Sequence, residues 1–165
     1  MERVMVKRRG IMILKVLAIS VLMFLGSSQL AAQQEVRRNT VRITSPRQGD
    51  EVGGRLVIEG TSEIRDGSRV WILIHPKLLI NQWWPQSRPV VDGKGNWQAL
   101  AYFGKEERQD DVGLDFEIAA ATFDEHAEAE ILKYHENGKN TGKWLPISFP
   151  KTTSQIAVVT VKKVR

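Results

Sequence analysis

Short runs in which apolar and polar residues alternate recur along most of the chain, separated by turn residues such as glycine, proline and aspartate. Successive side chains of a β-strand point to opposite faces of a sheet, so this alternation predicts half-buried strands. The runs are residues 41–43, 55–59, 89–91, 97–103, 114–123 and 155–164. Several short strands joined by turns predict an antiparallel β-sandwich.

Two neighbouring segments depart from simple alternation. Residues 69–75 (RVWILIH) are apolar on both faces, which predicts a central strand covered on both sides and ending at Pro76. Residues 77–86 (KLLINQWWPQ) are apolar without a regular period and contain Pro85, so they predict a structured loop.

One segment favours a helix. Residues 125–134 (EHAEAEILKY) are rich in helix formers, Asp124 can cap them, and Asn137 with Gly138 predicts their end. The same segment also alternates in part, so a strand remains an alternative. The sequence therefore predicts a mainly β fold, an antiparallel sandwich of about seven strands with one possible short helix near residues 125–136.

The first 32 residues have the order of a secretory signal peptide. Basic residues at positions 7–9 precede the apolar run 16–25, and the small residues Ala31 and Ala32 offer a cleavage site. Ten apolar residues reach only about 15 Å as a helix, roughly half the hydrocarbon thickness of a bilayer, so a stable membrane anchor is disfavoured. We expect residues 1–32 to be removed on export to the periplasm or the extracellular space. Residues 33–40 are polar and predict a flexible leader.

Removal of this segment changes the charge balance. Residues 1–32 hold five of the 24 basic residues and one of the 19 acidic residues, so 19 basic and 18 acidic residues remain. A nearly neutral mature chain gives no basis for nucleic-acid binding. Acidic residues concentrate in 106–136 and basic residues in 143–165, which we interpret as solvated faces that partly neutralise each other. The chain has no cysteine, so disulfides and lipoprotein acylation are excluded and stability must come from the core.

Part of the pattern resembles bacterial immunoglobulin-like and fibronectin-III-like modules, which are secreted β-sandwiches. The residues that carry the resemblance are Val41–Pro46, Gly49, Val52, Val57–Thr61, Asp92-Gly93, Trp97 and Val159–Val161. The resemblance covers about residues 41–164 and implies that residues 41–165 form one immunoglobulin-like domain. It also implies a module that binds or spaces other parts of a larger system. The Cys…Trp…Cys pattern of antibody domains is absent, so the resemblance does not make Trp71 a core tryptophan.

The adjacent tryptophans Trp83 and Trp84, followed by Gln86, are the candidate ligand-binding residues. Tryptophans exposed together on a loop offer flat apolar faces to sugar rings or partner proteins. The alternative is that one of them folds back and plugs the end of the sandwich. We expect Trp97, Tyr102 and Trp144 to be in the core or half-buried.

Signals for metal binding and catalysis are weak. Asp92, Lys94 and Asn96 have the spacing of oxygen ligands, but Lys94 replaces one ligand, so a plain hairpin turn is expected. A looser calcium site from Asp110, Asp111 and Asp115 is less expected than a solvated acidic loop. The three histidines lack metal-ligand spacing, and neither a nucleophile elbow nor a phosphate-binding loop is present. The sequence predicts no metal and no cofactor.

These observations predict a secreted, non-enzymatic immunoglobulin-like module that binds a protein partner through the Trp83/Trp84 loop or through an edge strand. The alternative is a carbohydrate-binding module that stacks glycans on Trp83 and Trp84. A hydrolase that uses acids of residues 106–136 has the least support, because no nucleophile–base pair is apparent.

Overall fold

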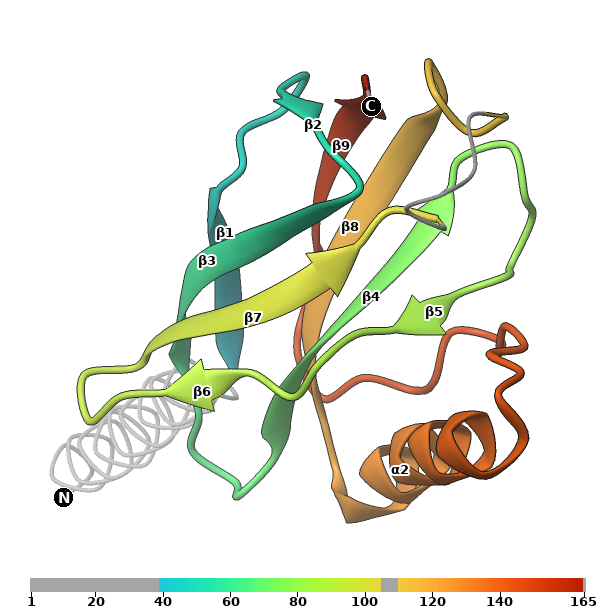
Figure 1. Cartoon of the computed structure of the whole chain (residues 1–165). Helices are drawn as coiled ribbons and strands as arrows, with labels where there is room; N and C mark the ends of the chain where they lie inside the picture. The colour runs from blue at the N-terminus through green and yellow to red at the C-terminus, as the bar shows by residue number, and fades with distance from the viewer. Residues whose placement is uncertain (1–38, 105–109, 165) are drawn as a thin grey trace, which may run out of the picture. The chain divides into compact units, whose positions relative to one another are not determined.

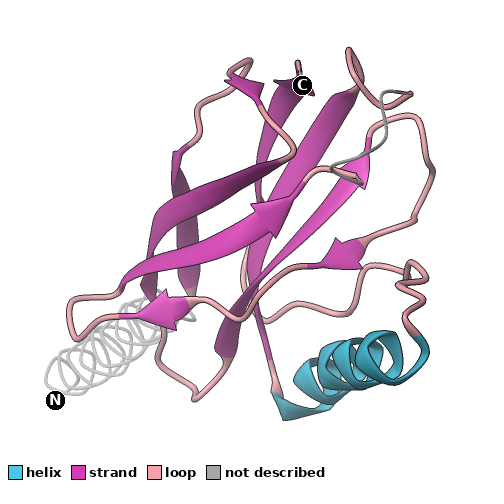
Figure 2. Ribbon diagram, in the orientation of Figure 1, coloured by secondary structure: helices cyan, strands magenta, loops and turns pink. Residues whose placement is uncertain are grey.

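The computed structural model describes residues 39–104 and 110–164. The predicted signal peptide, most of the predicted leader and part of the expected acidic loop at 105–112 lie outside the described residues. The described chain forms strands and one helix (Figures 1 and 2). They are β1 (Thr40–Ser45), β2 (Glu51–Val52), β3 (Arg55–Glu63), β4 (Arg69–Pro76), β5 (Trp84–Pro85), β6 (Val90–Val91), β7 (Asn96–Tyr102), β8 (Asp115–Phe123), α2 (Glu125–Thr141) and β9 (Ala157–Lys163).

The strands form two sheets, which confirms the predicted mainly β sandwich. One sheet has the order β1-β3-β7-β6 and the other has the order β2-β9-β8-β4-β5. All strand pairs are antiparallel except β2 with β9, which are parallel. The chain crosses from the first sheet to the second between β1 and β2, just after the cis peptide bond of Ser45–Pro46.

The main core lies between the facing sides of the two sheets. It contains Ile58 of β3 and Trp97 of β7 from the four-stranded sheet, with Ile72 of β4 and Ile118 of β8 from the five-stranded sheet. All four side chains are almost completely excluded from solvent, as expected for Trp97. Tyr102, at the end of β7, is 46% exposed and therefore more accessible than expected. This layer is built by the alternation that the sequence displays, because every second residue of each strand points inward.

The five-stranded sheet also buries its outer face. A second cluster joins Trp71 and Leu73 of β4 and Phe123 of β8 to Ile131 of α2. The prediction that residues 69–75 are covered on both sides is therefore confirmed, and Trp71 belongs to this outer layer. None of the helices in the described part of the chain is both long enough and apolar enough to cross a membrane.

Several boundaries differ from the predictions. The helix continues past Gly138 and ends at Gly142, whose φ of 68° is the left-handed conformation that glycine adopts at low cost. Asp124 caps its start as predicted, since its carboxylate accepts a hydrogen bond from the Ala127 N–H at 2.9 Å. Asn39 and Thr40 fall within the predicted leader, but Asn39 pairs with Ser154 and is buried, and Thr40 begins β1.

Candidate functional site

Two segments that are far apart in sequence are joined by hydrogen bonds at one side of the five-stranded sheet. Trp83 and Ile147 exchange both backbone N–H···O bonds at 2.9 Å. The Asn81 side chain donates to Ser148 Oγ at 3.2 Å and accepts from the Phe149 N–H at 3.3 Å. We call residues 77–84 together with residues 143–149 the paired-loop surface; Figure 1 shows the chain after α2 returning beside β5.

Trp83 fastens the first of these loops to the sheet. The side chain is half-buried, and its ring packs against the His75 ring with centroids 3.9 Å apart. Phe149 meets it in a T-shaped contact at 4.8 Å. Trp83 thus follows the alternative in which one tryptophan folds back onto the sandwich, although it covers the outer face and not an end.

His75 lies beneath the Trp83 ring and is itself held by two polar contacts. It is buried, and its Nδ1 lies 2.9 Å from the Leu79 carbonyl oxygen while its Nε2 lies 3.0 Å from Glu117 Oε2. Both neighbours are acceptors, so both bonds form together only when both ring nitrogens carry protons. These two contacts join His75 of β4 to Glu117 of β8 and to the loop that follows β4.

Trp84 and Trp144 lie next to each other on the paired-loop surface. The half-buried Trp84 donates its Nε1–H to the Trp144 carbonyl oxygen at 2.9 Å. The Trp144 side chain is 45% exposed, which is more than the sequence predicts, and its ring covers Gly138 of α2. A Cβ atom at Gly138 would lie only 2.3 Å from this ring, so the glycine allows the tryptophan to seat on the helix.

Gln86 is buried beneath this surface, and its amide is used inside the protein. Its Nε2 donates to the Trp84 carbonyl at 2.7 Å, and its Oε1 accepts from the Tyr102 N–H at 2.9 Å. Its backbone N–H donates to Ile72, so it connects the two sheets. His135 Nε2 lies 3.1 Å from the Gln86 carbonyl, and burial lowers the pKa of this histidine. This geometry gives Gln86 a bridging role, and direct ligand contact by Trp83, Trp84 and Gln86 stays a prediction.

The paired-loop surface exposes large aliphatic side chains. Ile80 is 90% exposed, Leu145 is 71% exposed and Leu78 is 61% exposed. These residues lie on loops whose backbones are fixed by the hydrogen bonds described above, so the apolar groups are held out in a defined arrangement. The sequence identifies Trp83 and Trp84 as candidate binding residues but not Ile80 and Leu145. The exposure of these two residues depends on the pairing of Trp83 with Ile147, which no local sequence pattern predicts.

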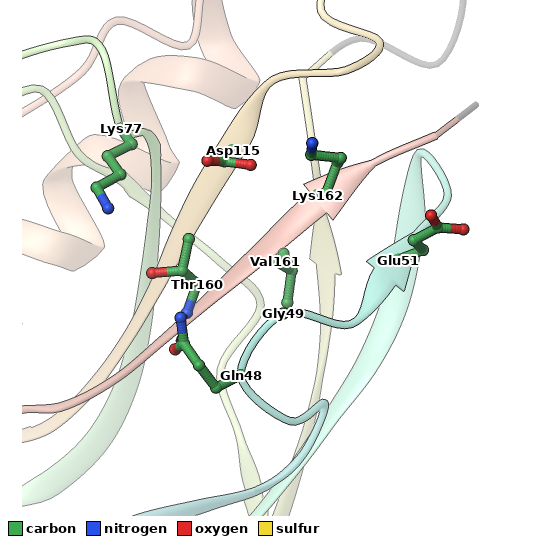
Figure 3. A pocket seen from close by; sticks show the side chains of 8 residues that line it. All are labelled: Gln48, Gly49, Glu51, Lys77, Asp115, Thr160, Val161 and Lys162. Carbon is green, nitrogen blue, oxygen red and sulfur yellow. Dashed lines mark hydrogen bonds between the residues drawn. The ribbon is translucent and has the colours of Figure 1, made fainter.

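A polar pocket of about 380 Å³ lies at the start of β8 and the end of β9, and Lys77 of the paired-loop surface contributes to its lining (Figure 3). Its charged groups come from Glu51, Lys77, Asp115 and Lys162. The backbone of Thr160 is already bonded to Gly49 and to the Gln48 side chain. Its eight lining residues include no histidine, serine or cysteine.

The two calcium candidates are occupied by internal contacts. The Asp92 carboxylate accepts hydrogen bonds from the backbone of Lys94 and from Asn96, as in the expected hairpin turn, and these bonds lower its pKa. Asp111 pairs with the buried Lys163 ammonium at 2.6 Å. Within residues 39–104 and 110–164, no three histidine or acidic side chains converge in a way that could hold a metal ion.

No protein-family model and no curated protein matches this chain.

Proposed function

We propose that this protein is an exported, non-enzymatic immunoglobulin-like module that binds a protein partner in the periplasm or at the cell surface through the paired-loop surface. The supporting observation is the combination of exposed aliphatic groups with fixed backbone: Ile80 and Leu145 protrude from loops tied together at Trp83 and Ile147. Rigid apolar side chains of this kind lose little entropy on association and mark interaction sites on soluble proteins.

The strand order supports the immunoglobulin-like part of the proposal. Constant-type immunoglobulin domains have one sheet with strands in the order ABED and a second sheet built from C, F and G. If β1, β3, β4, β6, β7, β8 and β9 are lettered A to G in chain order, the sheet β1-β3-β7-β6 has the order ABED. In the second sheet, the run β9-β8-β4 then corresponds to G, F and C. The long insertion that contains α2 lies between the strands that correspond to F and G.

A protein partner fits the surface better than a glycan on Trp83 and Trp84. A sugar ring stacks on a free aromatic face, whereas the Trp83 ring is already in contact with His75 and Phe149. The remaining exposed groups are mainly aliphatic, and they suit an apolar protein contact.

Site-specific photo-crosslinking in the producing cells tests this proposal. We expect p-benzoylphenylalanine at position 80 or 145 to give a discrete protein adduct. The same group at position 57 is the matched control, because Val57 is also an exposed aliphatic residue but lies on β3 of the other sheet. Equal labelling from all three positions, or no adduct from positions 80 and 145, would contradict the proposal. The mass of the mature protein from the periplasm tests cleavage near Ala32 in parallel.

A further inference from the structure

The segments that form and flank the paired-loop surface carry a net positive charge. Residues 77–84 and 139–151 contain four lysines and no aspartate or glutamate. The lysines are Lys77, Lys139, Lys143 and Lys151, and all four are exposed. In the described part of the chain, none of these lysines has an ion-pair partner.

Two carboxylates packed under the surface, those of Glu117 and Glu128, are bound to internal partners, whereas Asp115 and Glu51 line a pocket together with Lys77 and Lys162. Glu117 pairs with His75 at 3.0 Å. Glu128 accepts from Trp71 Nε1 at 3.1 Å and pairs with Arg88 at 3.2 Å. Both side chains are mostly buried, with exposed fractions of 26% for Glu117 and 15% for Glu128. Glu136 is an exposed acid on α2, one turn before Lys139.

We infer that the partner is a separate protein that offers an apolar cleft bordered by aspartate and glutamate side chains. The inference rests on the proposed function and names the chemistry of the partner. Ile80 and Leu145 protrude, so the complementary apolar surface is recessed. Exposed lysines around an apolar centre steer an acidic partner into place and disfavour a basic one. An acidic border also constrains the orientation of docking, since Lys77 and Lys143 belong to different loops of the surface.

The test measures the charge dependence of the adduct formed from p-benzoylphenylalanine at position 80. We expect Lys77→Glu combined with Lys143→Glu to reduce adduct yield roughly tenfold, because like charges would then face each other. Lys94→Glu is the matched control, since Lys94 is an exposed lysine in the turn before β7, and it should leave the yield unchanged. With purified protein and periplasmic extract, raising the salt from about 50 mM to about 500 mM should also reduce the yield through screening.

The outcomes separate the inference from the proposed function. An adduct whose yield is insensitive to salt and to both charge reversals overturns the acidic partner and leaves the binding function standing. An adduct with lipid, or one with the mass of two copies of this chain, also overturns the inference. Failure to form any adduct removes the proposed function itself. If the double Glu variant loses its folded circular-dichroism spectrum, Lys77→Gln with Lys143→Gln serves instead, with a smaller reduction in the same direction.

Discussion

The two faces of the five-stranded sheet are both buried, but they are buried in different ways. The inner face packs aliphatic and phenylalanine side chains such as Ile72, Ile118 and Phe116 against the other sheet. The outer face packs Trp71, Leu73 and Phe123 against α2 and the segment that follows it. The inner layer is thus closed by strands from the whole described chain, whereas the outer layer is closed by the insertion between β8 and β9 together with Trp83.

Polar contacts also distinguish the layers. The outer layer contains the Trp71–Glu128 hydrogen bond and the contact of His135 with the Gln86 carbonyl. In the inner layer, Trp97 Nε1 is buried without a partner among the described residues. The inner layer relies on close packing of its buried side chains. The outer layer adds hydrogen bonds that hold the paired-loop surface. We therefore expect substitutions in the two layers to affect stability and local unfolding differently.

We expect the largest loss of stability from adding a side-chain atom where the inner layer has no room for it. A Cβ atom at Gly60 would lie 2.1 Å from both the Arg42 carbonyl oxygen and the Trp97 ring. The carbonyl belongs to the paired strand β1 and cannot move without breaking the ladder. We expect Gly60→Ala to lower the free energy of unfolding by at least about 4 kcal/mol, as measured by urea denaturation.

Gly93→Ala is the control for this substitution. Nothing lies within 4 Å of the corresponding Cβ position, so its effect should stay within about 0.5 kcal/mol. Similar losses for the two variants would show that the close approach at Gly60 is not a constraint on the inner layer.

The two layers were also unequally predictable from sequence. Alternation in segments such as 97–103 and 114–123 predicts the inner layer, because a period of two directly determines which residues face inward. The doubly apolar segment 69–75 predicts that something covers the outer face, but it does not identify the cover. The helix is predicted too short because Asn137 and Gly138 read as a stop. In the structure Gly138 is an interior position that accommodates the Trp144 ring.

The candidate site shows the same limit. Trp83 and Trp84 are visible in the sequence as an unusual apolar loop, whereas their partners depend on a contact between residues 83 and 147. An isolated bridge between loops has no periodic signature. Ile80 and Leu145 therefore emerge only when the chain is folded.

A second, intermediate effect should come from the outer layer. Ile131 of α2 is fully buried in this layer, and truncation leaves a cavity between the helix and the sheet. We expect Ile131→Ala to cost about 3 kcal/mol. Hydrogen exchange should become faster in α2 before it does in β3 and β7, because the helix can detach while the sandwich persists.

Leu132→Ala provides the comparison for this variant. Leu132 is 47% exposed on the same helix, and its truncation should cost no more than about 0.5 kcal/mol. If Ile131→Ala instead accelerates exchange equally in both sheets, the two layers unfold as one unit and the distinction between them fails.

The smallest effect should be a pH dependence confined to the outer layer. Burial lowers the pKa of His135 from its ordinary value of 6.5; the nearby Lys139 also lowers it, and the hydrogen bond to Gln86 acts in the opposite direction. The folded state therefore favours the neutral imidazole, and the unfolded state binds the proton more readily. The resulting stability is present above pH 6.5 and is lost as the pH falls toward the depressed pKa.

We expect the urea midpoint of the wild type to fall over this pH range and the midpoint of His135→Gln to change less. His126→Gln is the control and should keep the wild-type profile, because His126 is 91% exposed. The ring centroids of Trp71 and His135 lie 5.6 Å apart, so the fluorescence of Trp71 should follow the same titration. Identical pH profiles of the urea midpoint in the two glutamine variants would place the pH dependence outside the outer layer.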